Sequence, residues 1–94
     1  MATLNFTKNG DKWVAEATVN KDYMLYLQKS QMACLKIFQR QEETDEWGQC
    51  DTRVYPFLNY STVCYRLSHG AYPMHVRFEC DAEVLEGRIT EVDA

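Results

Sequence analysis

Long apolar stretches are missing from this sequence. The longest uninterrupted one covers residues 23–27, far short of the ~20 residues that a membrane-spanning helix needs. The first residues, Met1 to Asn5, contain neither a basic region nor an apolar stretch followed by a cleavage site. We therefore expect a cytoplasmic protein that has no membrane partner.

Runs of basic residues are also missing. The ten Lys and Arg residues are never adjacent to one another, and the formal net charge is −4. Proteins that bind nucleic acids neutralise phosphates with a basic stripe or patch. The charge pattern therefore argues against nucleic acid as a partner.

No Cys-x-x-Cys motif occurs among the four cysteines, Cys34, Cys50, Cys64 and Cys80. An even number of cysteines in a small chain permits a disulfide framework with three possible connectivities. Four free thiols packed as small apolar side chains are the alternative. A reducing compartment favours the free thiols.

The sequence has few residues for catalysis or metal binding. It contains two histidines, His69 and His75, and no Gly-x-Ser-x-Gly motif. Zinc could be bound by these histidines with Cys64 and Cys80. However, His75 and Cys80 are five residues apart on one predicted strand, so their side chains point to opposite faces. We predict no catalytic residue, no metal and no cofactor.

What the sequence does contain is alternation with a period of two. In residues 74–80 apolar and polar side chains alternate without a fault, which is typical of a strand with one buried face. Asn9-Gly10 between two such runs is a strong hairpin signal. The last predicted strand contains Leu85 and Ile89, which we assign to its inner face. Gly87, within the same strand, suggests a bulge or a sharp bend.

Residues 22–43 are ambiguous. They are rich in Leu, Met, Gln, Lys and Ala, which favour helices, and Asp22 could cap a helix. Two separate apolar groups, residues 23–27 and 35–38, favour two strands joined by a turn, and this is the interpretation we prefer. An apolar strand without alternation needs cover on both faces.

Turn signals recur roughly every eight to twelve residues, a spacing typical of β-sandwiches and barrels. We predict one all-β domain over residues 1–94, an antiparallel up-and-down meander of about eight short strands that closes as a small barrel or sandwich. The strand order, with Trp13 at the start of the second hairpin arm, resembles small bacterial lipocalin-like β-barrel proteins of unknown function. Gly10-Asp11-Lys12-Trp13 stands where lipocalins have Gly-x-Trp, with one additional residue. This resemblance implies a fold but no particular ligand.

The aromatic residues, 13% of the chain, exceed what so small a core can hold. Exposed aromatic side chains mark protein interfaces or sugar-stacking surfaces. We therefore predict a non-enzymatic protein-interaction or self-association module whose partner is another protein or a second copy of the chain. The interface residues would be Trp47, Tyr55 and Phe57. The alternative is a small-ligand or carbohydrate binder with a pocket at the barrel mouth, lined by Trp13, Tyr26, Phe38 and Tyr65.

Overall fold

The computed structural model of the 94-residue chain describes residues 2–49, 60–68 and 72–92. These residues contain antiparallel strands and no helix, so the all-β prediction is confirmed. The described strands are β1 (Ala2–Thr3), β2 (Thr7–Asn9), β3 (Lys12–Val19), β4 (Tyr23–Lys29), β5 (Leu35–Arg40), β6 (Gly48–Gln49), β7 (Thr62–Leu67), β8 (Met74–Cys80) and β9 (Val84–Glu91).

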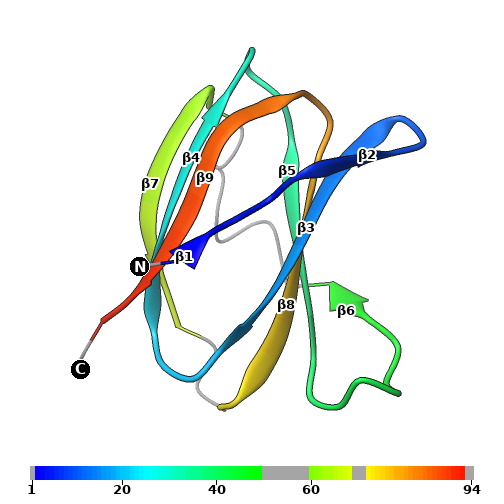
Figure 1. Cartoon of the computed structure of the whole chain (residues 1–94), viewed down its shortest axis with the longest axis vertical. Coiled ribbons are helices and arrows are strands. Elements are labelled where there is room, and N and C mark those ends of the chain that lie inside the picture. The colour runs from blue at the N-terminus through cyan, green and yellow to red at the C-terminus, as the bar shows by residue number, and fades with distance from the viewer. Residues whose placement is uncertain (1, 50–59, 69–71, 93–94) are drawn as a thin grey trace.

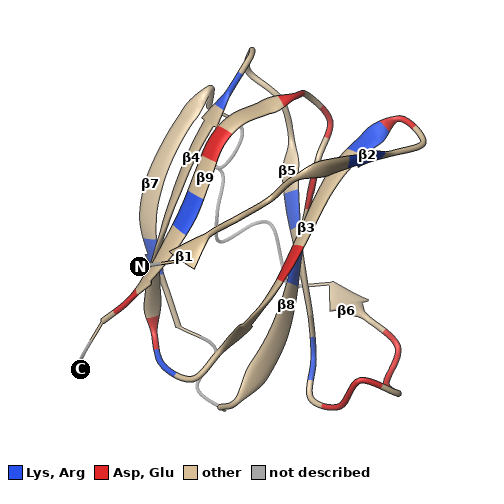
Figure 2. Ribbon diagram, viewed as in Figure 1, with Lys and Arg blue, Asp and Glu red and all other residues tan. Residues whose placement is uncertain are grey.

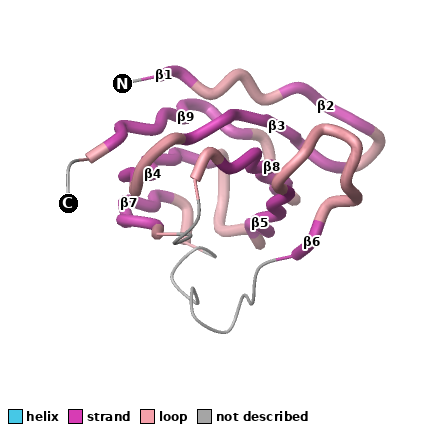
Figure 3. Tube along the Cα trace, turned by 90° about the horizontal axis from the view of Figure 1, so that it is seen from below, coloured by secondary structure: helices cyan, strands magenta, loops and turns pink. Residues whose placement is uncertain are grey.

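The strands form two sheets that lie in separate layers (Figure 1). Sheet I has the order β1-β9-β4-β7, and sheet II has the order β2-β3-β8-β5-β6. Viewed from below, β1 and β2 follow one another along one side of the molecule, across the edges of both sheets (Figure 3). The described strands form a sandwich-like arrangement rather than a closed barrel.

The predicted up-and-down meander is wrong. Among the described strands, only β2–β3 and β5–β6 are consecutive in the chain and also paired, while β3, β4, β5, β7, β8 and β9 alternate between the sheets. Facing sheets lie about 10 Å apart, and the three residues between β3 and β4 can reach that far when extended, at ~3.3–3.6 Å per residue. A short connection therefore does not distinguish a hairpin from a crossing between layers.

One core lies between the sheets. From sheet I it receives Tyr23, Leu25 and Leu27, and from sheet II it receives alternate residues of β8, including Val76 and Phe78. The Tyr23 and Phe78 rings meet edge to face, with centroids 6.4 Å apart and an interplanar angle of 82°. Each of these buried side chains stabilises the fold by about 1.5–3 kcal/mol relative to exposure.

Residues 22–43 form strands β4 and β5 joined by a turn, as preferred from the sequence. The outer face of β4 is partly covered from within the chain, because the Arg88 guanidinium lies 4.1 Å from the centre of the Tyr26 ring. This stack explains how an apolar strand without alternation can have one face outside the core. At Tyr26, therefore, the outer face does not need a partner to cover it.

The predicted hairpin joins β2 and β3. Asn9 belongs to β2, and the two turn residues are Gly10 and Asp11. Gly10 has φ +67°, a conformation that an L side chain disfavours. Glycine at the first of two turn positions matches the II′ turns that suit the twist of paired strands.

Lys29 is a buried charged residue at the end of β4. Its Nζ donates a hydrogen bond to the Ala33 carbonyl oxygen at 2.8 Å. Burial lowers the pKa of Lys29 below its usual value of 10.5, while the nearby Cys80, Cys34 and Asp81 act in the opposite direction. The ammonium group thus ties the end of β4 to the following turn at an electrostatic cost.

Asp22 links the two sheets at one end of the molecule. Tyr72, just before β8, donates its hydroxyl hydrogen to Asp22 Oδ1 at 2.7 Å, and Arg66 of β7 donates to Oδ2 at 3.1 Å. These hydrogen bonds, with the one to Ser68, hold the pKa of Asp22 below its usual value of 3.8. The carboxylate therefore favours the folded state whenever it is ionised.

Asp22→Asn should lower the free energy of unfolding at neutral pH, because the ion pair with Arg66 is lost. A depressed folded-state pKa means that the contribution is complete above 3.8 and disappears as the pH falls through the lower, folded value. The gap between the two proteins should therefore close in acid. Urea unfolding of both proteins at neutral pH and at a pH well below 3.8 measures this difference in stability. Glu46→Gln, at an exposed position, is the control. A gap that stays constant with pH would contradict this role.

Candidate functional site

The four residues predicted to line a ligand pocket do not meet. Trp13 lies on the inner face of β3, half-buried against the core, whereas Tyr26 lies on the outer face of sheet I under Arg88. Phe38 lies on the outer face of sheet II, since its neighbours on β5 are the ones that point inward. Tyr65 lies on β7 opposite Leu25 and is 37% exposed.

Of the predicted interface residues, Trp47 is in the connection between β5 and β6. It is half-buried, and the Arg40 guanidinium lies 4.1 Å from the centre of its ring. Tyr55 and Phe57 lie outside the described residues. Figure 2 shows that the connection carrying Trp47 also holds a group of acidic residues.

Leu85 is a surface residue that the sequence did not reveal. It was assigned to the inner face of the last strand, but it is 60% exposed. Gln28 pairs with Glu86 and Lys29 pairs with Val84, so β9 has one extra residue at Leu85. This β-bulge moves Leu85 out of the core. The sequence signal was Gly87, which suggested a bulge but could not fix its position.

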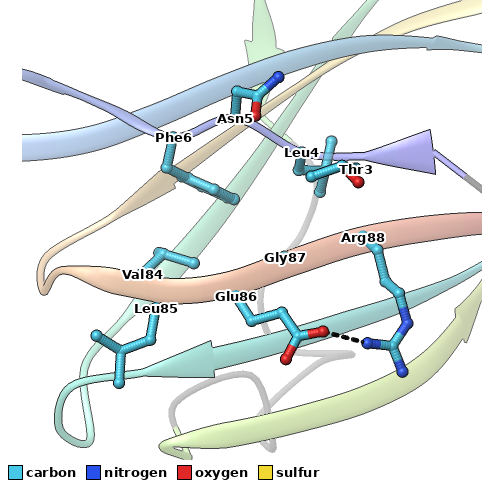
Figure 4. Close-up of a pocket in the computed structure, with 9 residues that line it drawn as sticks. All are labelled: Thr3, Leu4, Asn5, Phe6, Val84, Leu85, Glu86, Gly87 and Arg88. Carbon is cyan, nitrogen blue, oxygen red and sulfur yellow. Dashed lines mark hydrogen bonds and ion pairs between the residues drawn. The ribbon is translucent and has the colours of Figure 1, made fainter.

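A groove of about 600 Å³ lies beside this bulge (Figure 4). Its two sides are residues 3–6 and residues 84–88. β1 pairs with β9 as far as Leu4, whose N–H donates to the Gly87 carbonyl oxygen at 2.8 Å. The chain then leaves β9 and joins sheet II, where Thr7 pairs with Val14. The groove is the space between these diverging segments.

Gly87 allows the N-terminal segment to approach β9 closely. A Cβ atom at this position would lie 2.9 Å from Leu27 Cδ2, 3.0 Å from Phe6 Cε1 and 3.4 Å from Leu4 Cβ. Distances near 3.0 Å or below are too short for carbon atoms that are not bonded. A side chain at residue 87 would force Leu27 or Phe6 to shift. The close approach therefore favours glycine here, one of the recognised reasons for glycine inside a strand.

The groove combines apolar and charged walls. Leu4, Phe6 and Val84 pack on the core from inside, and Leu85 stands exposed outside. On the outer side Glu86 accepts a hydrogen bond from Arg88 at 2.6 Å (Figure 4). Such a surface can hold a ligand through apolar contacts and polar groups together.

A second, smaller pocket of about 210 Å³ lies on the outer face of sheet II. Thr18 Oγ1 and His75 Nδ1 are 3.1 Å apart there, and Trp47 and Arg40 form the opposite side. The buried Arg40 Nε makes no hydrogen bond to the described part of the chain. The pocket offers hydrogen-bond donors and acceptors beside one aromatic ring.

The residues that were considered as zinc ligands from the sequence lie apart from one another in the structure. Cys64 lies on the outer face of sheet I, Cys80 lies in the core, and His75 lies on the outer face of sheet II. His69 is not among the described residues. Within residues 2–49, 60–68 and 72–92 no group of three metal-ligating side chains is gathered, and Cys34, Cys64 and Cys80 carry free thiols.

The described residues also contain no helix with the length and apolar character to cross a membrane. No family model, curated protein or solved structure matches this chain. The geometry of the groove is therefore the evidence for the candidate site.

Gly87→Ala should destabilise the protein by about 1–3 kcal/mol, because the added methyl group overpacks the contact with Leu27 and Phe6. Gly48→Ala is the matched control in a strand, because its Cβ would meet only the Gln39 carbonyl oxygen at 3.6 Å, an ordinary contact. Urea unfolding of both variants provides the comparison. Equal effects at the two positions would show that the close approach at Gly87 is unimportant.

Proposed function

We propose that this domain is a non-enzymatic protein-interaction module that holds an extended segment of a partner polypeptide in the groove beside β9. The observation that carries the proposal is the exposed Leu85 at the edge of this groove. The volume of about 600 Å³ falls within the ~300–1,000 Å³ range of typical ligand sites. The groove also presents apolar side chains, Phe6 and Val84, beside the polar pair of Glu86 and Arg88, and this combination is typical of ligand sites.

Panning a displayed library of short random peptides against the domain tests the proposal. We expect enriched peptides with apolar residues, and we expect Leu85→Lys to reduce their affinity by about tenfold or more, as for a central contact residue. Met32→Lys is the matched control, because Met32 is 69% exposed and lies outside the groove. Failure to enrich any peptide, or equal losses in both variants, would refute the proposal.

A second candidate is a saccharide bound in the pocket on the outer face of sheet II. It is favoured by Trp47, whose ring could stack on a sugar, beside Arg40 and His75 as hydrogen-bonding groups. The pocket volume of about 210 Å³ is below the usual range for small-molecule sites, which restricts the ligand to a single small unit.

A glycan array tests this second candidate. Binding to one glycan should fall by at least about tenfold in Trp47→Ala, because stacking on an aromatic ring supplies much of the affinity. The same glycan should bind Leu85→Lys as well as it binds the wild type, since Leu85 is not part of this pocket. An array without a Trp47-dependent signal would exclude the saccharide.

A further inference from the structure

β7 is the edge strand of sheet I on the side away from β1, since the strand order is β1-β9-β4-β7. Seen from below, β9, β4 and β7 follow one another away from the N-terminal segment (Figure 3). Among the described strands only β4 pairs with β7, in a regular register from Tyr23 opposite Leu67 to Gln28 opposite Thr62. The other side of β7 is therefore an edge of the described sheet.

Half of the backbone groups of β7 point toward this edge. The Lys29 N–H donates to the Ser61 carbonyl oxygen at 2.7 Å, and such hydrogen-bonded pairs alternate along an antiparallel ladder. On the other side of β4 the Val92 N–H donates to the Asp22 carbonyl oxygen at 2.9 Å, which agrees with this alternation. The residues of β7 whose N–H and C=O groups point away from β4 are therefore Thr62, Cys64 and Arg66.

β7 has none of the features that commonly protect a sheet edge. Its six residues include no proline and no lysine, and its pairing with β4 has no bulge. The one charged residue, Arg66, is paired with Asp22 of the same copy at 3.1 Å. The outward residues are exposed. Such an edge is a template for pairing with another strand.

We propose that two copies of this chain associate by antiparallel pairing of their β7 strands, with a two-fold axis at Cys64. In this register Cys64 pairs with itself, and Thr62 pairs with Arg66 of the second copy. All three outward residues then form hydrogen-bonded pairs. A two-fold interface uses the same surface on both copies, as a strand paired with itself does.

Side chains and charge also fit a second copy. Tyr65 is opposite the buried Leu25 but is 37% exposed. In the dimer it would lie opposite Val63 of the second copy, and aromatic and β-branched side chains pair favourably across strands. Arg66 would face Thr62, so that like charges are not opposed. β7 carries no acidic residue (Figure 2), so the acidic groups behind the net charge of −4 lie outside the contact.

The dimer goes beyond the proposed function and does not depend on it. The groove lies between residues 3–6 and β9, at the opposite edge of sheet I. Both grooves would therefore stay open in the dimer. Two linked grooves would hold a partner with two suitable segments more tightly than one groove does.

Sedimentation velocity over about 1 μM to 1 mM protein tests the association, and we expect a concentration-dependent dimer. Thr62→Pro should weaken it by about tenfold or more, because proline removes an N–H that points to the edge. This variant should stay folded in urea unfolding, since that N–H does not bond β4. Thr62→Val keeps the N–H and is the matched control, which should dimerise like the wild type.

A disulfide tests the register. Opposed residues of a hydrogen-bonded pair have Cα atoms ~5.5 Å apart, within the ~4.4–6.8 Å that disulfides span. In a Cys50→Ser background, oxidised glutathione should join two Cys64 thiols and be reduced to two molecules of glutathione. Adding Cys64→Ser should remove the covalent dimer and leave the reversible dimer intact.

The possible failures are distinguishable. A monomer at every concentration would overturn the inference and leave the groove proposal standing. A dimer that Thr62→Pro does not weaken, or a covalent dimer that forms without Cys64, would place the contact on another surface and would also overturn it. Peptide panning that enriches nothing would remove the groove proposal and leave the dimer.

Discussion

The contact between the N-terminal segment and Gly87 is the constraint on which this end of the molecule depends. The Leu4 N–H bonds the Gly87 carbonyl oxygen, and Leu4 and Phe6 pack where a Cβ of residue 87 would lie. Next to this contact the segment leaves β9, and it reaches sheet II within the three residues between β1 and β2. The same contact joins the edges of the two layers and creates the groove, so the packing and the candidate site have one cause.

The two sheets divide the surface into regions of different character. Their outer faces carry ion pairs and cation–π contacts, such as Arg88 over Tyr26 and Arg77 with Glu16 and Glu79. Exposed ion pairs contribute little to stability, but here they give several charged side chains of these faces a partner within the chain. At the edge where the N-terminal segment leaves β9, no described strand pairs with residues 84–86 on that side, and a groove lies there. This difference is why we place the function at the edge.

Part of the fold could be predicted because alternation is a local property. The strand at residues 74–80, the hairpin at Gly10 and the two strands within residues 22–43 were all read from short stretches. The order of strands could not be read in this way, because links of three residues join facing sheets as easily as paired strands. The predicted pocket depended on that order. The prediction placed four residues around the interior of one barrel. In the structure Trp13 and Phe38 belong to sheet II, whereas Tyr26 and Tyr65 belong to sheet I.

By itself, the sequence determined that the chain forms β-strands and where most of them run. For strands with clear alternation, such as residues 74–80, it also determined which side is apolar. These properties follow from the backbone, which turns successive side chains to opposite faces, and from glycine at a turn. Only the tertiary structure decided that Leu85 is exposed, because the bulge exists through the register of β9 against β4. The tertiary structure also shows why residue 87 is a glycine. A bulge and a close approach both favour glycine, and the choice between them depends on Leu27 and Phe6, which are distant in the chain.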